Sequence, residues 1–303
     1  MLSKALTSHV ELHRGLGFKF RTQHLLLRSF VSFAEAQGDR FVHVDRVLEW
    51  ARQAPSSAQR RNRLVTARRF ALALHAEDPL HEVPPADALG REMFRRRIPY
   101  IYAPDEISRL MAAAAALSTD SDRPRTYVTL FGLLAATGMR ISEALALHLD
   151  DITADGLIIR RTKFQKSRLL PLHDTTRSAL DQYLSVRRRM TAPAETLFVS
   201  GRGNVLSDNT VRAVFLRLTR SLDLRGRPGQ RAPRIHDLRH TYAVRSLEQC
   251  GNDPDTVARH LLALSTYLGH AHVTDTYWYL EATPILMAQI AEVSEAAHQG
   301  GVA

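Results

Sequence analysis

Residues 127–147, YVTLFGLLAATGMRISEALAL, contain two helical patterns interrupted by a turn. Apolar spacing predicts a helix over residues 127–136, and Gly138 breaks it. The pattern then resumes, so a second helix is expected to start beside Arg140. A helix N-terminus offers backbone N–H groups that, together with a guanidinium, can bind one anion. Glu143 lies three residues further on the same face, where it could hold Arg140 in place or form only a surface ion pair.

The sequence on either side predicts a mainly α fold with a small β-hairpin or sheet. Strands are expected at 157–159 and 168–172, with a polar turn at 163–167 between them. The first 80 residues predict four short helices, one of them with Leu25, Leu26, Phe30 and Phe33 on its apolar face. Other helices are expected at 104–117, 139–147, 175–189, 208–221, 237–249, 256–268 and 284–296.

Proline and charge mark a division into two domains. Four prolines lie between residues 79 and 99 among charged residues, which is typical of a linker. A length of 303 residues also suits two domains. We therefore expect a helical domain over residues 1–83, a linker over 84–100 and a mixed α+β domain over 101–303.

Composition narrows the class of protein. Hydrophobic residues make up 45% and charged residues 24% of the chain, which is the balance of a globular protein and not of a disordered chain or a membrane bundle. The single cysteine, Cys250, rules out an intrachain disulfide and a cysteine-rich zinc site. The first 20 residues are polar, unlike a signal peptide, and the apolar run 128–136 is too short to span a bilayer. A cytoplasmic protein without a membrane partner is expected.

Positive charge is concentrated in the first third of the chain. The formal net charge is +10, and residues 1–100 hold 17 Lys and Arg against 10 Asp and Glu. Such a surface suits a polyanion such as DNA or RNA, and arginine in particular makes bidentate phosphate contacts. The candidate DNA-binding residues form two clusters, which could alternatively be a solvated basic face: Arg60, Arg61, Arg63, Arg68 and Arg69, then Arg95, Arg96 and Arg97.

The segment HDLRH, residues 236–240, carries further polar groups. His236 and Arg239 are three residues apart and share a helical face. An imidazole and a guanidinium that point together suit an anionic transition state. His236 and His240 have the spacing of a metal-binding pair, but no third ligand of fitting spacing is evident. We therefore expect neither a metal nor another cofactor.

Two more places have chemically useful side chains. Lys163 and Lys166 lie in the expected hairpin turn, from which a lysine could reach into a groove and protonate a leaving group, or simply solubilise the turn. A glycine that ends a helix places His270 at a corner. Tyr277 and Tyr279 are two residues apart and face differently on any helix, so at most one is expected to enter a given site.

These groups together predict a reaction class. They place cations around a phosphate and supply a phenol as nucleophile, without a pair of carboxylates. Enzymes that hydrolyse phosphodiesters usually bind divalent metals through carboxylates. The set therefore predicts phosphoryl transfer through a covalent tyrosine intermediate.

The ordered motifs resemble the tyrosine recombinase (phage integrase) family. They are ATGMRISE at 136–143, KFQKSRLLPL at 163–172, HDLRH at 236–240, LGH at 268–270, and Tyr279. The resemblance covers nearly the whole chain. It implies that the N-terminal 90 residues are a helical, SAM-like core-binding domain and that the rest is the catalytic domain.

The family pattern implies roles for the residues that surround the phosphate. Arg140 and Arg239 resemble the two arginines that clamp the scissile phosphate, with Glu143 in support. His270 matches the position that bonds a non-bridging oxygen.

Proton transfer and attack are assigned in the same way. Lys163 matches the hairpin lysine that acts as general acid for the 5′-hydroxyl, with Lys166 as the alternative. His236 matches the histidine that assists proton transfer. Tyr279 lies nine residues after His270, which is the family spacing for the nucleophile; Tyr277 is the alternative.

The implied reaction is strand exchange on double-stranded DNA recombination sites, through a 3′-phosphotyrosine and without ATP or metal. The family implies a homotetramer on two DNA sites. The chain also resembles integrases that are encoded by transposable elements, which implies partner recombinases of the same element. A tail helix at 284–296 would dock on a neighbour or pack in cis. Two other classes remain open at this point: a DNA-binding regulator without cleavage, and a type IB topoisomerase.

Overall fold

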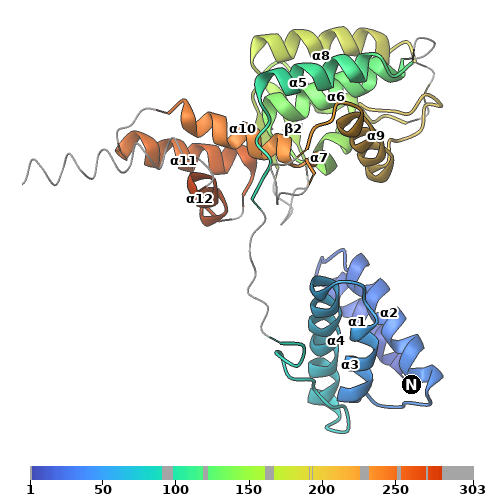
Figure 1. Cartoon of the computed structure of the whole chain (residues 1–303). Helices are drawn as coiled ribbons and strands as arrows, with labels where there is room; N and C mark the ends of the chain where they lie inside the picture. The colour runs from blue at the N-terminus through green and yellow to red at the C-terminus, as the bar shows by residue number, and fades with distance from the viewer. Residues whose placement is uncertain are drawn as a thin grey trace, which may run out of the picture. The chain divides into compact units, whose positions relative to one another are not determined.

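The structure is a computed structural model, and Figure 1 shows the course of the chain. It describes residues 2–90, 98–118, 122–160, 167–190, 192, 194–225, 232–250, 254–270 and 272–281. The fold is mainly α with a small antiparallel sheet, as the sequence predicted. The chain divides into two compact units, residues 1–96 and 97–303. The boundary between the units lies within the stretch proposed as a linker.

Unit 1 has four helices among its described residues: α1 (Leu2–Gly15), α2 (Arg21–Ala36), α3 (Val44–Arg52) and α4 (Ser57–Glu77). The Ser56 hydroxyl caps α4 by accepting a hydrogen bond from the backbone N–H of Gln59 at 3.3 Å. The helices enclose a core of aromatic and aliphatic side chains that includes Leu27, Phe30, Trp50, Leu64 and Phe70. The four predicted helices are confirmed.

The predicted apolar face of α2 was partly wrong. Leu25 was expected in the core, yet 58% of it is exposed. Leu27, Phe30, Val31 and Ala34 are the buried residues of the helix. Their spacing of three and four residues defines a stripe that is rotated away from Leu25, because adjacent leucines cannot all face one side of a helix.

Unit 2 combines helices with one small sheet. Its described helices are α5 (Pro104–Ala115), α6 (Arg123–Thr137), α7 (Ile141–Leu145), η1 (Leu149–Asp151), α8 (Asp174–Arg187), α9 (Asp208–Ser221), α10 (Asp237–Glu248), α11 (Pro254–Leu268) and α12 (Thr274–Glu281). A large core forms around side chains that include Tyr102, Leu130, Phe131, Phe198 and Phe215. A second cluster, with Val244, Leu264 and Leu268, joins α10, α11 and α12, which lie together in Figure 1.

The sheet has the order β1 (Ile152–Thr153), β2 (Gly156–Ile159), β3 (Arg168–Leu170), with antiparallel pairing. Leu157 pairs with both Ile152 and Leu170. The β2–β3 pairing confirms the two predicted strands, whereas the two-residue β1 was too short to show a pattern. Gly156 is required here, because a Cβ at this position would lie 2.3 Å from the Leu170 carbonyl oxygen.

The turn between α6 and α7 follows the predicted break. Gly138 is the C-cap of α6 and has a φ of 61° in the left-handed region that favours glycine. A Cβ at Gly138 would approach the Tyr242 ring at 2.6 Å. The turn therefore needs glycine both for its backbone conformation and for its contact with α10.

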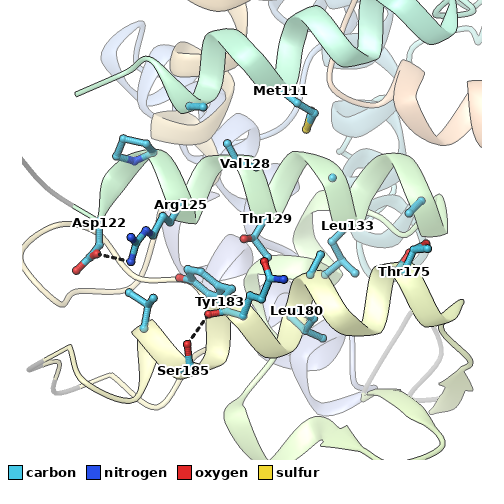
Figure 2. A pocket seen from close by; sticks show the side chains of 18 of the residues that line it. Met111, Asp122, Arg125, Val128, Thr129, Leu133, Thr175, Leu180, Tyr183 and Ser185 are labelled. Atoms are coloured by element: carbon cyan, nitrogen blue, oxygen red, sulfur yellow. Dashed lines mark hydrogen bonds and ion pairs between the residues drawn. The ribbon is translucent and has the colours of Figure 1, made fainter. Parts of the chain in front are cut away.

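A groove with a volume of about 1280 Å³ lies among α5, α6 and α8. Figure 2 shows Met111, Val128, Leu133 and Leu180 among the side chains that line it. The polar residues described below as the candidate site do not line this groove. Among the residues that the structure describes, none of the helices combines the length and apolar character needed to cross a bilayer.

Candidate active site

The centre of the candidate site is Arg239, on the first turn of α10. Only 2% of this arginine is exposed. Its Nη1 donates to the Gly138 carbonyl and its Nη2 to the Leu268 carbonyl, both at 2.8 Å. Burial and the nearby charge of Arg140 lower the pKa of Arg239 to about 10. The guanidinium is therefore a fixed cation at neutral pH, held between the end of α6 and the end of α11.

A buried carboxylate fixes the start of α10. Asp237 accepts hydrogen bonds from the Arg234 backbone N–H at 2.7 Å and from its Nη2 at 2.9 Å. Thr241, one turn later, donates to the Asp237 carbonyl and accepts from the backbone N–H of Tyr102. These bonds orient the helix turn that carries Arg239.

Arg140 occupies the N-cap of α7, as the glycine turn predicted. Its Nη1 donates to Glu143 Oε1 at 2.9 Å, and its backbone N–H donates to Glu143 Oε2 at 3.0 Å. Its Nη2 donates to the Gly269 carbonyl at 3.1 Å. The expected pairing of Arg140 with Glu143 is therefore present, and it holds a guanidinium that is still 30% exposed.

A third arginine, Arg168 on β3, enters the same cluster and was missed by the sequence reasoning. It donates to both carboxylate oxygens of Glu143, at 3.1 and 3.0 Å. Its Nε donates to the Tyr267 carbonyl at 2.9 Å. Burial raises the pKa of Glu143, but the bonds and charge of Arg168, with those of Arg140, outweigh it and lower the pKa overall. Glu143 is thus an ionised carboxylate shared by two arginines.

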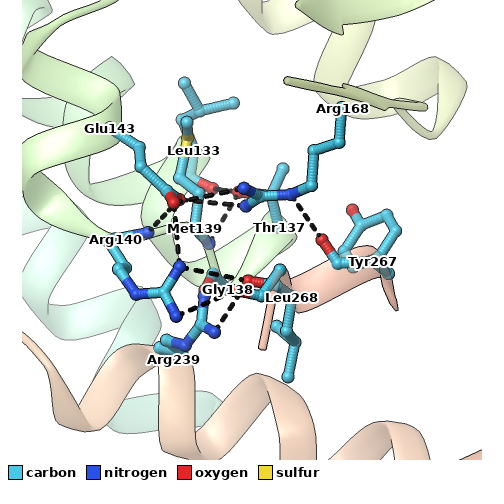
Figure 3. Close-up of polar contacts among 11 residues, drawn as sticks. Leu133, Thr137, Gly138, Met139, Arg140, Glu143, Arg168, Arg239, Tyr267 and Leu268 are labelled. Carbon is cyan, nitrogen blue, oxygen red and sulfur yellow. Dashed lines mark hydrogen bonds and ion pairs between the residues drawn. The ribbon is translucent and has the colours of Figure 1, made fainter. Parts of the chain in front are cut away.

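The three arginines converge on the C-terminal end of α11, as Figure 3 shows. The backbone N–H of His270 bonds to the Ser265 carbonyl and that of Gly269 to the Thr266 carbonyl, which is a Schellman motif. The Leu268 carbonyl accepts from both Arg239 and Arg140. A helix C-terminus carries partial negative charge, so it stabilises the gathered cations.

The Schellman turn carries His270 to the edge of this cluster. Its Nδ1 lies 2.7 Å from the hydroxyl of Thr276, a buried residue of α12. Burial and the charges of Arg239 and Arg140 lower the pKa of His270 to about 4. The ring is therefore neutral at pH 7, and its plane lies 17° from that of the Tyr279 ring.

The two candidate tyrosines have different surroundings. Tyr279 is 3% exposed and Tyr277 is 50% exposed. The Tyr279 hydroxyl lies 3.2 Å from His240 Nδ1 and within the electrostatic influence of Arg239. Burial raises the pKa of Tyr279, and the positive charge of Arg239 works in the opposite direction. Of the two phenols, Tyr279 is the one brought among the arginines.

The imidazole that contacts the Tyr279 hydroxyl is His240, which the sequence reasoning weighed only as a metal ligand. The rings of His236 and His240 meet edge to face, with centroids 4.7 Å apart. Burial, followed by the charges of Arg239 and Arg234, lowers the pKa of His236 to about 4. Burial and the neighbouring His236 lower the pKa of His240 to about 3. The i, i+4 spacing was visible in the sequence, but the partner of the second histidine was not.

Several candidates lie outside the described residues. They are Lys163 and Lys166, the arginines Arg95, Arg96 and Arg97, and the tail helix expected at 284–296. Within the described part of the chain, no group of three or more His, Cys, Asp or Glu side chains is arranged to hold a metal ion.

The arginines of α4 divide into two groups. Arg60, Arg61 and Arg69 are exposed, and of these Arg60 also donates from its Nε to the Ala54 carbonyl at 2.8 Å. Arg63 is half-buried, lies 4.9 Å over the Trp50 ring and donates to the Trp50 carbonyl at 2.8 Å. Arg68 is also half-buried and donates to the Pro84 carbonyl. The last two therefore have bonds within unit 1 as well as positive charge.

Comparison with known proteins gives one family. The model of the phage integrase family matches residues 101–284. A protein of Sinorhizobium fredii (strain NBRC 101917 / NGR234) named as an integrase/recombinase, y4rB, is 40% identical over 298 residues, or 94% of each chain.

Solved structures agree in fold. The XerH site-specific recombinase in a post-cleavage complex with its difH substrate has a TM-score of 0.66 at 18% identity, covering 90% of this chain and 79% of that one. A lambda integrase tetramer bound to a Holliday junction has a TM-score of 0.63 at 18% identity, covering 90% and 78%. At these identities the likeness concerns the two-domain fold.

Proposed function

This chain belongs to the phage integrase family, and from that premise we propose that it is a site-specific DNA recombinase of the tyrosine type. It would cleave and rejoin DNA strands through a covalent 3′-phosphotyrosine. The observation that carries the proposal is the position of the buried Tyr279 near Arg239, whose guanidinium binds the end of α11 where Arg140 also binds. A phenol and two guanidinium groups in one place are the parts that such a reaction needs.

The roles follow from what each group can do. Arg239 and Arg140 would bind the non-bridging oxygens of the scissile phosphate, because both are cations oriented by backbone carbonyls or by Glu143. His270, neutral in the free protein, would donate a hydrogen bond to another of these oxygens. Tyr279 would attack phosphorus and displace the 5′-hydroxyl.

The resemblance of the sequence to the family adds two residues for proton transfer to the proposal. Lys163 would protonate the departing 5′-oxygen, with Lys166 as the alternative. His236 would assist proton transfer, as its place in the family motif implies. The 5′-hydroxyl of a partner strand would then attack the phosphotyrosine and reseal the backbone. Bond energy is kept in the phosphotyrosine, so the cycle needs neither ATP nor a metal cofactor.

The partners are proposed on the same basis. The substrate would be double-stranded DNA recombination sites, with the exposed arginines of α4 contributing phosphate contacts. A homotetramer on two sites is proposed, since one exchange needs four strand cleavages. The chain would act in the bacterial cytoplasm on behalf of a mobile element, with other recombinases of that element as further partners.

The test is covalent trapping on nicked duplex DNA. Duplexes that the full chain selects from a random-sequence library are synthesised with a nick that lets the cleaved strand diffuse away. The wild type is expected to give a protein–DNA band that survives denaturation, Tyr279→Phe to give none, and Tyr277→Phe to retain it. A band that persists in Tyr279→Phe overturns the nucleophile, and DNA binding without any band favours a regulator.

The same preparation separates the recombinase from a topoisomerase. A recombinase exchanges strands between two selected sites. Relaxation of supercoiled plasmid that lacks the selected sequence, at a rate proportional to protein concentration, would instead indicate a type IB topoisomerase.

A further inference from the structure

We propose that His240 is the group that accepts the phenolic proton of Tyr279 when the tyrosine attacks DNA. The proposal rests on the function proposed above and adds a catalytic residue to it. The sequence pattern assigns proton transfer to His236, whereas the imidazole nitrogen beside the Tyr279 oxygen belongs to His240, one helical turn later.

The charges around the phenol favour one direction for this contact. The positive charge of Arg239 acts on Tyr279 and favours the phenolate over the phenol. His240 Nδ1 lies 3.2 Å from the Tyr279 oxygen, and the neutral ring can accept the phenolic hydrogen there. A phenol that donates to Nδ1 beside a guanidinium is placed to lose its proton.

The surroundings hold the two side chains together. Tyr279 lies on α12 and His240 on α10, and both helices pack in the cluster that includes Ala243, Val244 and Leu268. The His240 ring meets Tyr279 on one side and Trp278 edge to face, with centroid distances of 5.5 and 5.1 Å. The His236 ring meets the His240 ring edge to face, with centroids 4.7 Å apart.

The protonation state of His240 suits an acceptor. Burial and the surrounding cations keep its pKa well below 7, so the ring is neutral and its lone pair is available. The titratable and charged groups that face it are His236, Arg234 and Arg239 on or before α10, His270 after α11, and Tyr279 on α12. A bound phosphate would offset the arginine charges, which raises the basicity of His240 when the substrate is in place.

Every bond and every proton in the cleavage step can be accounted for. The Tyr279 oxygen forms a bond to phosphorus, and its proton moves to His240 Nδ1. The bond between phosphorus and the 5′-oxygen breaks, and that oxygen takes a proton from the general acid, assigned above to Lys163. In rejoining, protonated His240 returns its proton to the leaving phenolate, while the hairpin lysine receives the one from the attacking 5′-hydroxyl.

The main test variant is His240→Asn. An asparagine amide can keep a hydrogen bond at the Nδ1 position but cannot accept a proton at neutral pH. The rate of covalent trapping on the selected nicked duplex is expected to fall by about 100-fold or more, the usual contribution of general base catalysis. Duplex affinity, measured by gel shift, should stay unchanged. His260→Asn is the matched control, because this imidazole binds the Ser246 hydroxyl on α10 at 2.9 Å.

Two readouts separate a proton acceptor from a structural role. Between pH 6 and 9 the His240→Asn rate should rise more steeply with pH than the wild-type rate, because the phenol must now ionise unaided. In His240→Ala, added imidazole should restore trapping in proportion to its free-base concentration. Should His240→Ala fail to fold, the pH profile of His240→Asn still decides.

The outcomes distinguish the two proposals. If the wild type traps DNA and His240→Asn traps it at the same rate, or loses rate with an unchanged pH profile and no imidazole rescue, the role of His240 is wrong and the recombinase stands. If the wild type forms no covalent bond that depends on Tyr279, the proposed function itself fails.

Discussion

Arg168 and Glu143 form a two-pronged ion pair, with Nη1–Oε1 and Nη2–Oε2 distances of 3.1 and 3.0 Å. Twenty-five residues separate the two in the sequence, and the pair links β3 to the turn that carries Arg140. Glu143 is 8% exposed at its side chain, so its charge depends on these partners. The strand that follows the expected hairpin lysine is thereby tied to a candidate phosphate ligand.

Replacing Arg168 by Met should therefore lower both stability and cleavage. Removal of Arg168 leaves the buried Glu143 carboxylate with Arg140 as its remaining charged partner, so the loss in free energy of unfolding is expected to be at most about 3 kcal/mol. Arg212→Met is the control, because its ion pair with Asp208 is exposed and should contribute less than about 1 kcal/mol. Urea unfolding followed by circular dichroism measures the free energy of unfolding of both variants. Equal losses in the two variants would show that the Arg168 pair is no stronger than a surface pair.

Stability should fall as the solution becomes mildly acidic. The pKa values of His236, His240 and His270 are lowered from 6.5 to about 4, 3 and 4. Between pH 6.5 and 4 the unfolded chain therefore binds more protons than the folded one, and each histidine removes at most about 1.4 kcal/mol per pH unit. Stability is full above pH 6.5 and declines below it.

The pH effect can be assigned to one ring. His240→Asn should show a shallower decline in the urea midpoint between pH 6.5 and 4.5 than the wild type, because one proton-binding group is gone. Thr274→Ala, an exposed change at the start of α12 that removes no ionisable group, is the control and should leave the slope unaltered. A wild-type midpoint that is constant over this range contradicts the buried, neutral state of the three rings.

Thr276 should matter to cleavage through His270. The Thr276 hydroxyl lies 2.7 Å from His270 Nδ1, and if it donates to that nitrogen, the ring proton stays on Nε2, where it can face a phosphate oxygen. Thr276→Val keeps the shape but removes the donor, so covalent trapping should slow while gel-shift affinity is retained. Thr276→Ser restores the hydroxyl and should recover the rate; a serine variant as slow as the valine one would point to packing instead.

The arginines of α4 should separate into binding and structural members. If exposed Arg61 contacts a phosphate, Arg61→Gln should reduce the slope of log affinity against log salt by about 0.9. Arg63→Gln should lower the free energy of unfolding by about 1 kcal/mol, because it loses its contacts with Trp50. Titrations of the selected duplex at several salt concentrations check the first, and an unchanged slope would make Arg61 a solvated residue.

Local sequence patterns predicted much of this molecule. The helices from α1 to α11 and the β2–β3 pairing follow from apolar spacing and from breaks such as Gly138. The ion pair of Arg140 with Glu143 also followed, since a separation of three residues on a helix is a local relation.

What the sequence could not supply are contacts between distant segments. In the sequence, Arg168 is only a charged residue at the start of a predicted strand. Its place beside Glu143 depends on how α7 and β3 pack. His240 likewise shows its spacing to His236 but not its approach to Tyr279, which comes from α12, 39 residues later. Exposure of Leu25 on α2 has the same origin, because only packing selects among adjacent leucines.

The carbonyl of Leu268 makes the arrangement of the candidate site depend on correct folding of the end of α11. Arg239 and Arg140 both use this oxygen, so they find their common anchor only when α11 ends in its Schellman turn and lies against α10. A nascent or damaged chain in which that end has frayed would hold its cations apart and could not organise them around a backbone phosphate. The end of α11 therefore couples the arrangement of the two arginines to the folding of unit 2, and an incompletely folded copy would lack that arrangement.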